Sequence, residues 1–255
     1  MKLSALLLAL GAAAVAAVAT LAPASAVANA SSCGAGTHGS NGYAYAGFQS
    51  GAIAHGVRAT ITPLSRPTVS NGHVAGWVGV GGPGQGPNGE TMWLQAGIAA
   101  IPGMPPMVYA EITRPGQAPV FVPLVENVEP GQRFKLSILE MSRRPDFWRV
   151  WLNDRPATEP VHLPGSTKRW RPIATAETWN GGTTVCNGFG FRFEQVDVAR
   201  TKGGSWRPFA PGYTFLDRGY KVRKLATGSG PVRTLATGNA VVVEPYAFEA
   251  ASAAA

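Results

Sequence analysis

Short stretches in which apolar and polar residues alternate run through most of the chain. The clearest are 57–62, 134–138 and 189–193, where every second residue is apolar. A period of two leaves one face of a β-strand for a core and the other for solvent. The pattern therefore predicts an all-β fold, an antiparallel two-sheet β-sandwich. We expect strands at 42–49, 56–63, 74–81, 91–99, 107–113, 119–125, 132–141, 146–152, 170–178 and 188–198.

Turn-forming residues support many short strands, since the chain has 32 glycines and 21 prolines. The apolar stretch 147–152 ends at Asn153-Asp154, a turn signal, and a returning segment follows up to Pro164-Gly165. A strand, a turn and a return strand are typical of concanavalin-like sandwiches, which are jelly rolls of two curved antiparallel sheets. We therefore expect a concanavalin-like jelly roll.

The two ends of the chain differ from its middle. Lys2 precedes an apolar run at 6–21 and the small-x-small pattern Ala24-Ser25-Ala26, which predicts a signal peptide at 1–26 and a secreted, extracellular protein. This run of ~16 residues is short for a bilayer span, which needs about 20. We expect the jelly-roll domain at 27–200 and a linker with a short irregular C-terminal tail at 201–255. In that tail, 241–243 is a candidate edge strand and 247–255 is expected to be frayed.

Two cysteines, Cys33 and Cys186, lie in the part predicted to be exported. Disulfides persist in oxidising compartments, so one structural disulfide between them is the expected state. A thiol nucleophile is the alternative, and a two-cysteine metal site is less favoured because no His or Cys stands nearby at ligand spacing.

The formal net charge of +8 limits the range of partners. Basic residues occur in small groups at 143–144, 168–171 and 218–224, without the aromatic and basic signature of a nucleic-acid module. We interpret them as a solvated face. The predicted partner is a polypeptide substrate or an extracellular glycan, with no nucleic acid, no membrane after signal cleavage, and a monomeric state.

A glutamine and a glutamate stand inside apolar, strand-like segments. Gln95 lies in the segment 93–98 and Glu177 in 173–179. A buried amide and a buried carboxyl are costly unless they are paired. If their strands lie side by side, the two groups could hold a water between them, with the carboxylate as general base and the amide as donor to a developing oxyanion. A hydrogen-bonded pair without catalysis is the structural alternative.

Around these two residues the chain resembles the glutamic peptidases of the eqolisin family. The matching motifs are Trp77-Val78-Gly79, Leu94-Gln95-Ala96-Gly97 and Ala176-Glu177, and the resemblance covers about 71–198. It implies the same jelly-roll fold and peptide hydrolysis at acidic pH. Glu177 would activate a water, and the Gln95 amide would stabilise the tetrahedral intermediate.

The resemblance also implies a set of substrate-binding residues. Trp77 matches a tryptophan that lines the family's cleft. Glu111, in Tyr109-Ala110-Glu111, falls where the family has a glutamate within an aromatic-rich strand, and Trp179 matches the family's tryptophan beside the catalytic glutamate, one position late. The family's acidic residue shortly after the glutamine is replaced here by the apolar stretch 98–100.

Other enzyme classes lack their motifs. No Glu-x-Asp-x-x-Glu run is present, so a glycosidase would have to pair Glu177 with Glu111 or Asp197. The glycine-rich loop 81–89 lacks a phosphate-loop ending and is expected to rim a cleft instead. Zinc and calcium motifs are absent, so no cofactor is predicted. A serine-hydrolase elbow is also absent, and the histidines are predicted to be surface or turn residues: His38, His55, His73 and His162.

A secreted binding module is the non-enzymatic alternative. Its aromatic residues would line a concave sheet and stack on sugar rings or on a peptide. A peptidase instead needs Gln95 and Glu177 facing each other in an open groove. The tryptophans considered for the binding role are Trp77, Trp93, Trp148, Trp151 and Trp179.

Overall fold

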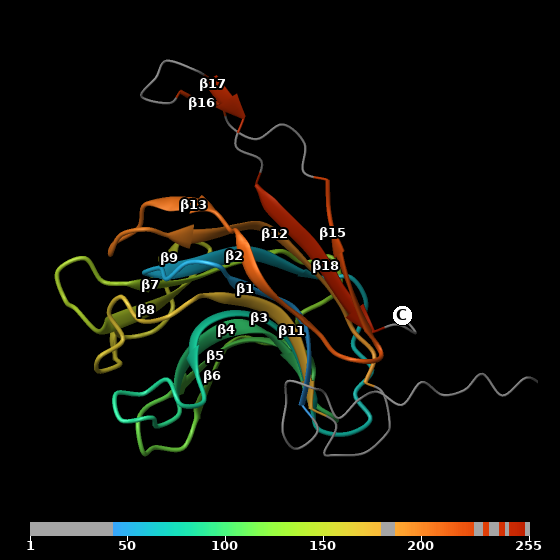
Figure 1. Ribbon diagram of the computed structural model, residues 1–255. Helices are drawn as coiled ribbons and strands as arrows, with labels where there is room; N and C mark the ends of the chain where they lie inside the picture. The colour runs from blue at the N-terminus through green and yellow to red at the C-terminus, as the bar shows by residue number, and fades with distance from the viewer. Residues whose placement is uncertain (1–42, 180–186, 227–231, 235–239, 243–244, 253–255) are drawn as a thin grey trace, which may run out of the picture. The chain divides into compact units, whose positions relative to one another are not determined.

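The computed structural model describes residues 43–179, 187–226, 232–234, 240–242 and 245–252. Within this part of the chain the regular elements are antiparallel strands, and no helix could span a membrane. A first sheet has seven strands in the order β14-β1-β11-β3-β4-β5-β6 (Figure 1). Its strands are β1 (Tyr43–Ser50), β3 (His73–Gly82), β4 (Met92–Ala100), β5 (Met107–Thr113), β6 (Val120–Val125), β11 (Ile173–Trp179) and β14 (Pro211–Leu216).

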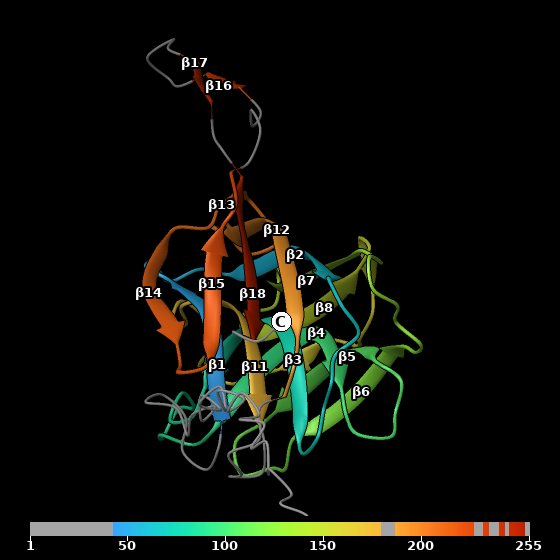
Figure 2. The ribbon, with the colours of Figure 1, turned by 90° about the vertical axis from the view of Figure 1, so that its right-hand side faces the viewer.

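A second sheet follows the order β10-β8-β7-β2-β12-β18-β15, with β13 paired to β12 and β9 paired to β8 (Figure 2). A separate two-stranded pair is formed by β16 and β17. The bounds are β2 (Gly56–Pro63), β7 (Phe134–Glu140), β8 (Phe147–Leu152), β9 (Arg155–Pro156), β10 (Val161–His162), β12 (Gly190–Ala199), β13 (Trp206–Pro208), β15 (Tyr220–Lys224), β16 (Val232–Thr234), β17 (Ala240–Val242) and β18 (Tyr246–Ser252).

The main core fills the space between the two sheets. Leu94 and Ile98 of β4 and Phe191 and Phe193 of β12 are fully buried in it. The two positions of each pair differ by an even number, so both side chains point to the same face of their strand. Burying one such side chain stabilises the fold by about 1.5 to 3 kcal/mol. The opposite face of the first sheet is concave and lies on the side away from the second sheet (Figure 1). The predicted all-β sandwich is confirmed.

The C-terminal region corrects the sequence interpretation. Residues 201–255 were expected to form a linker and an irregular tail, yet β14 pairs with β1 and β18 pairs with both β12 and β15. Phe248 of β18 is fully buried, and its ring lies 4.5 Å from that of Phe193 and 4.9 Å from that of Phe48. The sandwich therefore needs the segment that was expected to be frayed.

Other terminal predictions have different outcomes. The candidate edge strand at 241–243 is represented by β17, which pairs with β16 and not with the sandwich. The signal peptide at 1–26, Cys33 and Cys186 lie outside the described residues, so the signal and the disulfide stay predictions.

A buried polar cluster ties the second sheet to the segment that leads into β11. Glu140 is fully buried, and its carboxylate accepts hydrogen bonds from the Thr167 hydroxyl and, at 3.2 Å, from the Asp146 backbone N–H. His55 Nδ1 lies 2.6 Å from Glu140 Oε2, and the His55 side chain is only 12% exposed. His55 lies in the bend just before β2, so of the two predicted settings, surface or turn, it has the turn. A buried carboxylate requires such partners.

Candidate active site

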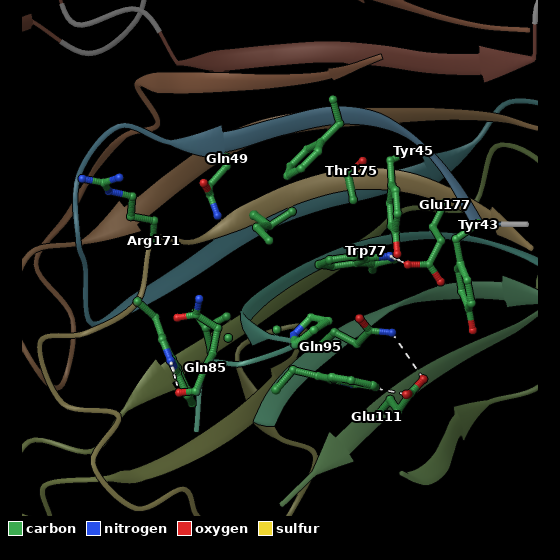
Figure 3. A pocket seen from close by; sticks show the side chains of 18 of the residues that line it. Tyr43, Tyr45, Gln49, Trp77, Gln85, Gln95, Glu111, Arg171, Thr175 and Glu177 are labelled. Atoms are coloured by element: carbon green, nitrogen blue, oxygen red, sulfur yellow. Dashed lines mark hydrogen bonds between the residues drawn. The ribbon is translucent and has the colours of Figure 1, made fainter. Parts of the chain in front are cut away.

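A groove of about 790 Å³ runs over the concave face of the first sheet. It is lined by side chains from β1, β3, β4, β5, β11 and β14 (Figure 3). Successive strand residues point to opposite faces, so the residues between the core positions of β4 and β11 reach into the groove. These include Gln95, between the core residues Leu94 and Ala96, and Glu177, which follows the core residue Ala176.

Two glycines make room for the indole of Trp77 on the floor of the groove. A Cβ atom at Gly79 would stand 2.8 Å from the Trp77 ring, and one at Gly97 would stand 2.6 Å from Trp77 Cβ. Both distances are too short for a real contact, so these positions must be glycine if the indole keeps its place. Trp77 is 7% exposed and lies on β3, between the strands that carry Gln95 and Glu177.

Glu177 is held from several sides. Trp77 Nε1–H donates to Glu177 Oε2 at 3.2 Å, and His73 Nε2 lies 3.2 Å from Oε1. Tyr45 stands opposite Glu177 in the β1–β11 register and also lines the groove. Burial, followed by the negative charge of Glu177, raises the pKa of Tyr45 far above its usual range, so its hydroxyl remains a donor. The carboxyl is thus fixed in orientation but still lines the groove.

Gln95 is held by a second group of residues. Its Nε2 donates to the Tyr109 hydroxyl at 3.1 Å and to Glu111 Oε2 at 3.3 Å. Glu111 Oε1 accepts a hydrogen bond from Trp93 Nε1 at 3.2 Å. Burial raises the pKa of Glu111, and the charge of Glu177 raises it further, while the hydrogen bonds from Trp93 and Gln95 and the nearby His73 oppose the shift. Glu111 therefore keeps its proton to a higher pH than an exposed glutamate.

Gln95 and Glu177 face the same groove but do not lie on neighbouring strands. The condition considered from the sequence, that their strands lie side by side, is not met, because β3 lies between β11 and β4. Glu177 is opposite Ala75 of β3 and Gln95 is opposite Gly79, with Trp77 midway between them. Figure 3 shows the Glu177 carboxyl beside the edge of the Trp77 ring and the Gln95 side chain below that ring, with its amide directed toward Glu111.

Comparison with solved structures identifies the fold, whereas no protein-family model and no curated protein sequence matches the chain. Scytalido-glutamic peptidase with a peptide-based transition state analog matches with a TM-score of 0.50 and 13% identity, over 82% of this chain and 97% of that chain. The chain has the fold of a glutamic peptidase. The same enzyme with a transition state analog inhibitor gives the same values: a TM-score of 0.50, 13% identity, and coverage of 82% and 97%.

A third structure is SCP-B, a member of the eqolisin family of peptidases, in a complex with the tripeptide Ala-Ile-His. It matches with a TM-score of 0.43 and 12% identity, over 83% of this chain and 98% of that chain. The predicted resemblance to the glutamic peptidases is confirmed at the level of the fold, which is what an identity of 13% can establish.

The residues predicted to bind substrate divide into two groups within this glutamic-peptidase fold. Trp77 and Glu111 line the groove. Tyr109 is buried beneath Gln95 and stacks on Phe121, with ring centroids 4.8 Å apart, so it supports the site from below. Trp179 stacks on Tyr43 at 6.2 Å and is not among the residues that line the groove. The loop expected to rim the groove does so through Gly81, Gly82, Pro83 and Gln85.

His73 is a groove residue that sequence reasoning missed. It was expected to be a surface or turn residue, yet it begins β3, lines the groove and pairs with Glu177 across 104 residues of sequence. Its ring also packs against Tyr43 at 5.8 Å and Trp179 at 6.0 Å. Only the β3–β11 register, which sets His73 opposite Trp179, brings these groups together.

Other chemistry receives less support from the described residues. In this part of the chain no group of three His, Cys, Asp or Glu side chains could hold a metal ion. Asp197, one possible partner of Glu177 in a glycosidase, instead pairs with Arg58 at 2.8 Å in the second sheet. His162 is exposed, as predicted for a surface histidine.

Proposed function

We propose that the protein is a secreted endopeptidase that hydrolyses peptide bonds at acidic pH with Glu177 and Gln95. The observation that carries the proposal is the placement of a buried carboxylate and a buried amide on opposite sides of Trp77 in one open groove. Each group is oriented by its own donors and acceptors. The glutamic-peptidase fold supports the same assignment, and the signal-like start of the chain supports secretion.

Glu177 would act first as a general base. Its carboxylate takes a proton from a water molecule while the water oxygen attacks the carbonyl carbon of the peptide. The tetrahedral intermediate carries a negative oxygen, which accepts a hydrogen bond from the Gln95 amide. Glu177, now protonated, then gives its proton to the leaving nitrogen as the C–N bond breaks. Trp77 Nε1–H remains on Glu177 Oε2 and keeps the carboxyl aligned through both transfers.

Glu111 supplies a reason for activity in acid. Both N–H groups of the Gln95 amide have an acceptor in the free protein, one in Tyr109 and one in Glu111. A hydrogen bond to a charged carboxylate is stronger than one to a neutral carboxyl. Protonation of Glu111, favoured by its raised pKa, therefore weakens its hold on Gln95. One amide N–H can then turn to the oxyanion.

The test is degradation of an unfolded protein substrate by the purified chain across pH 2 to 7. Glu177→Gln and Gln95→Ala are compared with the wild type, and Glu159→Gln serves as a matched control because Glu159 is exposed and outside the groove. Circular dichroism verifies the fold of each variant. We expect acid-dependent cleavage that both groove variants lose and the control keeps. Equal cleavage by wild type and Glu177→Gln would refute the assignment.

A non-catalytic binding module for carbohydrate or peptide is the second candidate. Tyr43, Tyr45 and Phe215 line one side of the groove, and the rings of Tyr43 and Tyr45 are stacked 6.3 Å apart. Such rings suit stacking on sugars or on peptide side chains. Trp148, which was considered for this role, is fully buried in the core. If the folded wild type cleaves nothing, a glycan array that compares the wild type with Tyr43→Ala tests whether the groove binds carbohydrate.

A further inference from the structure

One wall of the groove carries charges of opposite sign at its two ends. Alternate residues from 169 to 177 line the groove: Arg169, Arg171, Ile173, Thr175 and Glu177. Ile173, Thr175 and Glu177 alternate along β11 and therefore point to the same side of the sheet, and the segment that leads into β11 brings Arg169 and Arg171 to the same groove. This wall begins with two cations and ends at the proposed catalytic carboxylate.

The cationic end lies well away from the carboxylates. Figure 3 shows Arg171, with Gln49 and Gln85, at the end of the groove opposite Glu177 and Tyr43. Six residues of extended chain separate Arg171 from Glu177, which corresponds to about 20 Å at ~3.3 Å per residue. An extended peptide covers the same length with about six residues. The two ends can therefore contact different parts of one peptide.

The two arginines have no ion-pair partner among the described side chains. Both are exposed. The positive charge of Arg169 contributes to the lowered pKa of Glu90. The Glu90 carboxylate, however, already accepts hydrogen bonds from the backbone N–H and the side-chain amide of Asn88. The guanidinium groups are thus available to a ligand that enters the groove.

We propose that Arg169 and Arg171 form a subsite for an acidic side chain, so that the preferred substrates are polypeptides with Asp or Glu about four to six residues from the cleaved bond. This inference rests on the proposed peptidase function of the same groove. A guanidinium group matches a carboxylate in shape and charge. Glu177 and Glu111 disfavour an acidic side chain at the other end, so the charge gradient also fixes the direction in which a peptide lies.

The experiment measures peptide binding separately from cleavage. Fluorescence anisotropy of labelled twelve-residue peptides is recorded with Glu177→Gln, so that no peptide is consumed. A single Glu is moved through the peptide, and each peptide has a partner with Gln at the same position. We expect Glu to improve affinity about three- to tenfold over Gln at distal positions on one side, as expected for one or two partly screened ion pairs. The gain should vanish near pH 3, where the peptide's Glu is protonated.

Two double variants identify the cations responsible. Arg169→Ala with Arg171→Ala, in the Glu177→Gln background, should bring the Glu-to-Gln affinity ratio to about one. The control, Arg143→Ala with Arg207→Ala, removes the same charge from exposed positions outside the groove and should keep the ratio. Arg171→Glu should shift the preference toward peptides with Lys at the same distal position.

Three results would overturn the inference. They are equal affinity for the Glu and Gln peptides at every position, an unchanged ratio in the Arg169 and Arg171 double variant, and tighter binding of an oligogalacturonate than of the best acidic peptide. Wild-type cleavage of the neutral peptides is measured in parallel. Cleavage without a Glu preference would leave the peptidase proposal standing and remove only the subsite. A Glu preference in binding without any cleavage would remove the peptidase proposal and leave the acidic-peptide site.

Discussion

Replacement of Glu140 by alanine should cost a large part of the stability of the fold. Its carboxylate is 0% exposed and forms hydrogen bonds with the His55 ring, the Thr167 hydroxyl and the Asp146 backbone N–H. Removing one partner of a buried charged pair typically costs about 3 to 5 kcal/mol. For a domain of this size that corresponds to a fall in melting temperature on the order of 10 °C. Glu140→Gln keeps the shape and one acceptor, so we expect it to lie between the alanine variant and the wild type.

The assay is guanidinium unfolding followed by tryptophan fluorescence, since the buried Trp148 lies on β8, opposite Glu140 in the β7–β8 register. Far-ultraviolet circular dichroism should give the same midpoint if unfolding is two-state. Glu159→Ala, at an exposed position, is the matched control and should change the unfolding free energy by less than about 0.5 kcal/mol. A loss below about 1 kcal/mol in Glu140→Ala would refute the reasoning, because it would mean that water replaces the carboxylate at little cost.

Three further perturbations test other parts of the molecule. Trp77→Phe keeps an aromatic ring on the floor of the groove but removes the N–H that donates to Glu177. We expect kcat to fall about tenfold or more. An unchanged kcat would show that this hydrogen bond has no role. Phe248→Ala should destabilise the fold by about 3 to 5 kcal/mol in urea unfolding, whereas a loss near zero would mean that β18 is dispensable. The pKa of Glu111 is raised above its ordinary value of 4.5 in the folded protein. Between the pKa of the unfolded state and the higher pKa of the folded state, the folded protein therefore binds more protons than the unfolded chain. The wild type should therefore lose stability as the pH rises through that window, while Glu111→Gln should lack this decline, and parallel urea midpoints at pH 4 to 7 would contradict it.

The sequence predicted the strands wherever burial on one face imposes alternation. In β2 and β7, Val57, Ile61 and Leu136 mark the core face, and these strands were expected close to their observed bounds. β14 has no such signal, because it is an edge strand whose residues are mostly exposed. β18 was missed because its alanine-rich sequence has weak strand preference, and its place is set by packing of Phe248 on distant rings.

The same reasoning explains what was found and missed in the candidate site. Gln95 and Glu177 could be recognised because polar residues within apolar strands are unusual. His73 could not, because its partner Glu177 stands 104 residues away and the local sequence resembles a turn. The insertion of β3 between β4 and β11 is a property of sheet order, which strand patterns alone do not encode.

The long-range pairing of β1 has a consequence for the order in which a newly made chain can fold. One edge of β1 is closed by β11 and the other by β14, and the Tyr45 backbone N–H is bound by the Asp217 carboxylate across 172 residues of sequence. β12 pairs with β2 on one side, but its pairing with β18 on the other side has to wait until β18 has been made. A ribosome-bound chain therefore carries an unfinished sandwich until Ser252, the last residue of β18, has been made. Folding dominated by such distant contacts is slow, and the sheet that carries the groove is complete only once β14 has been made.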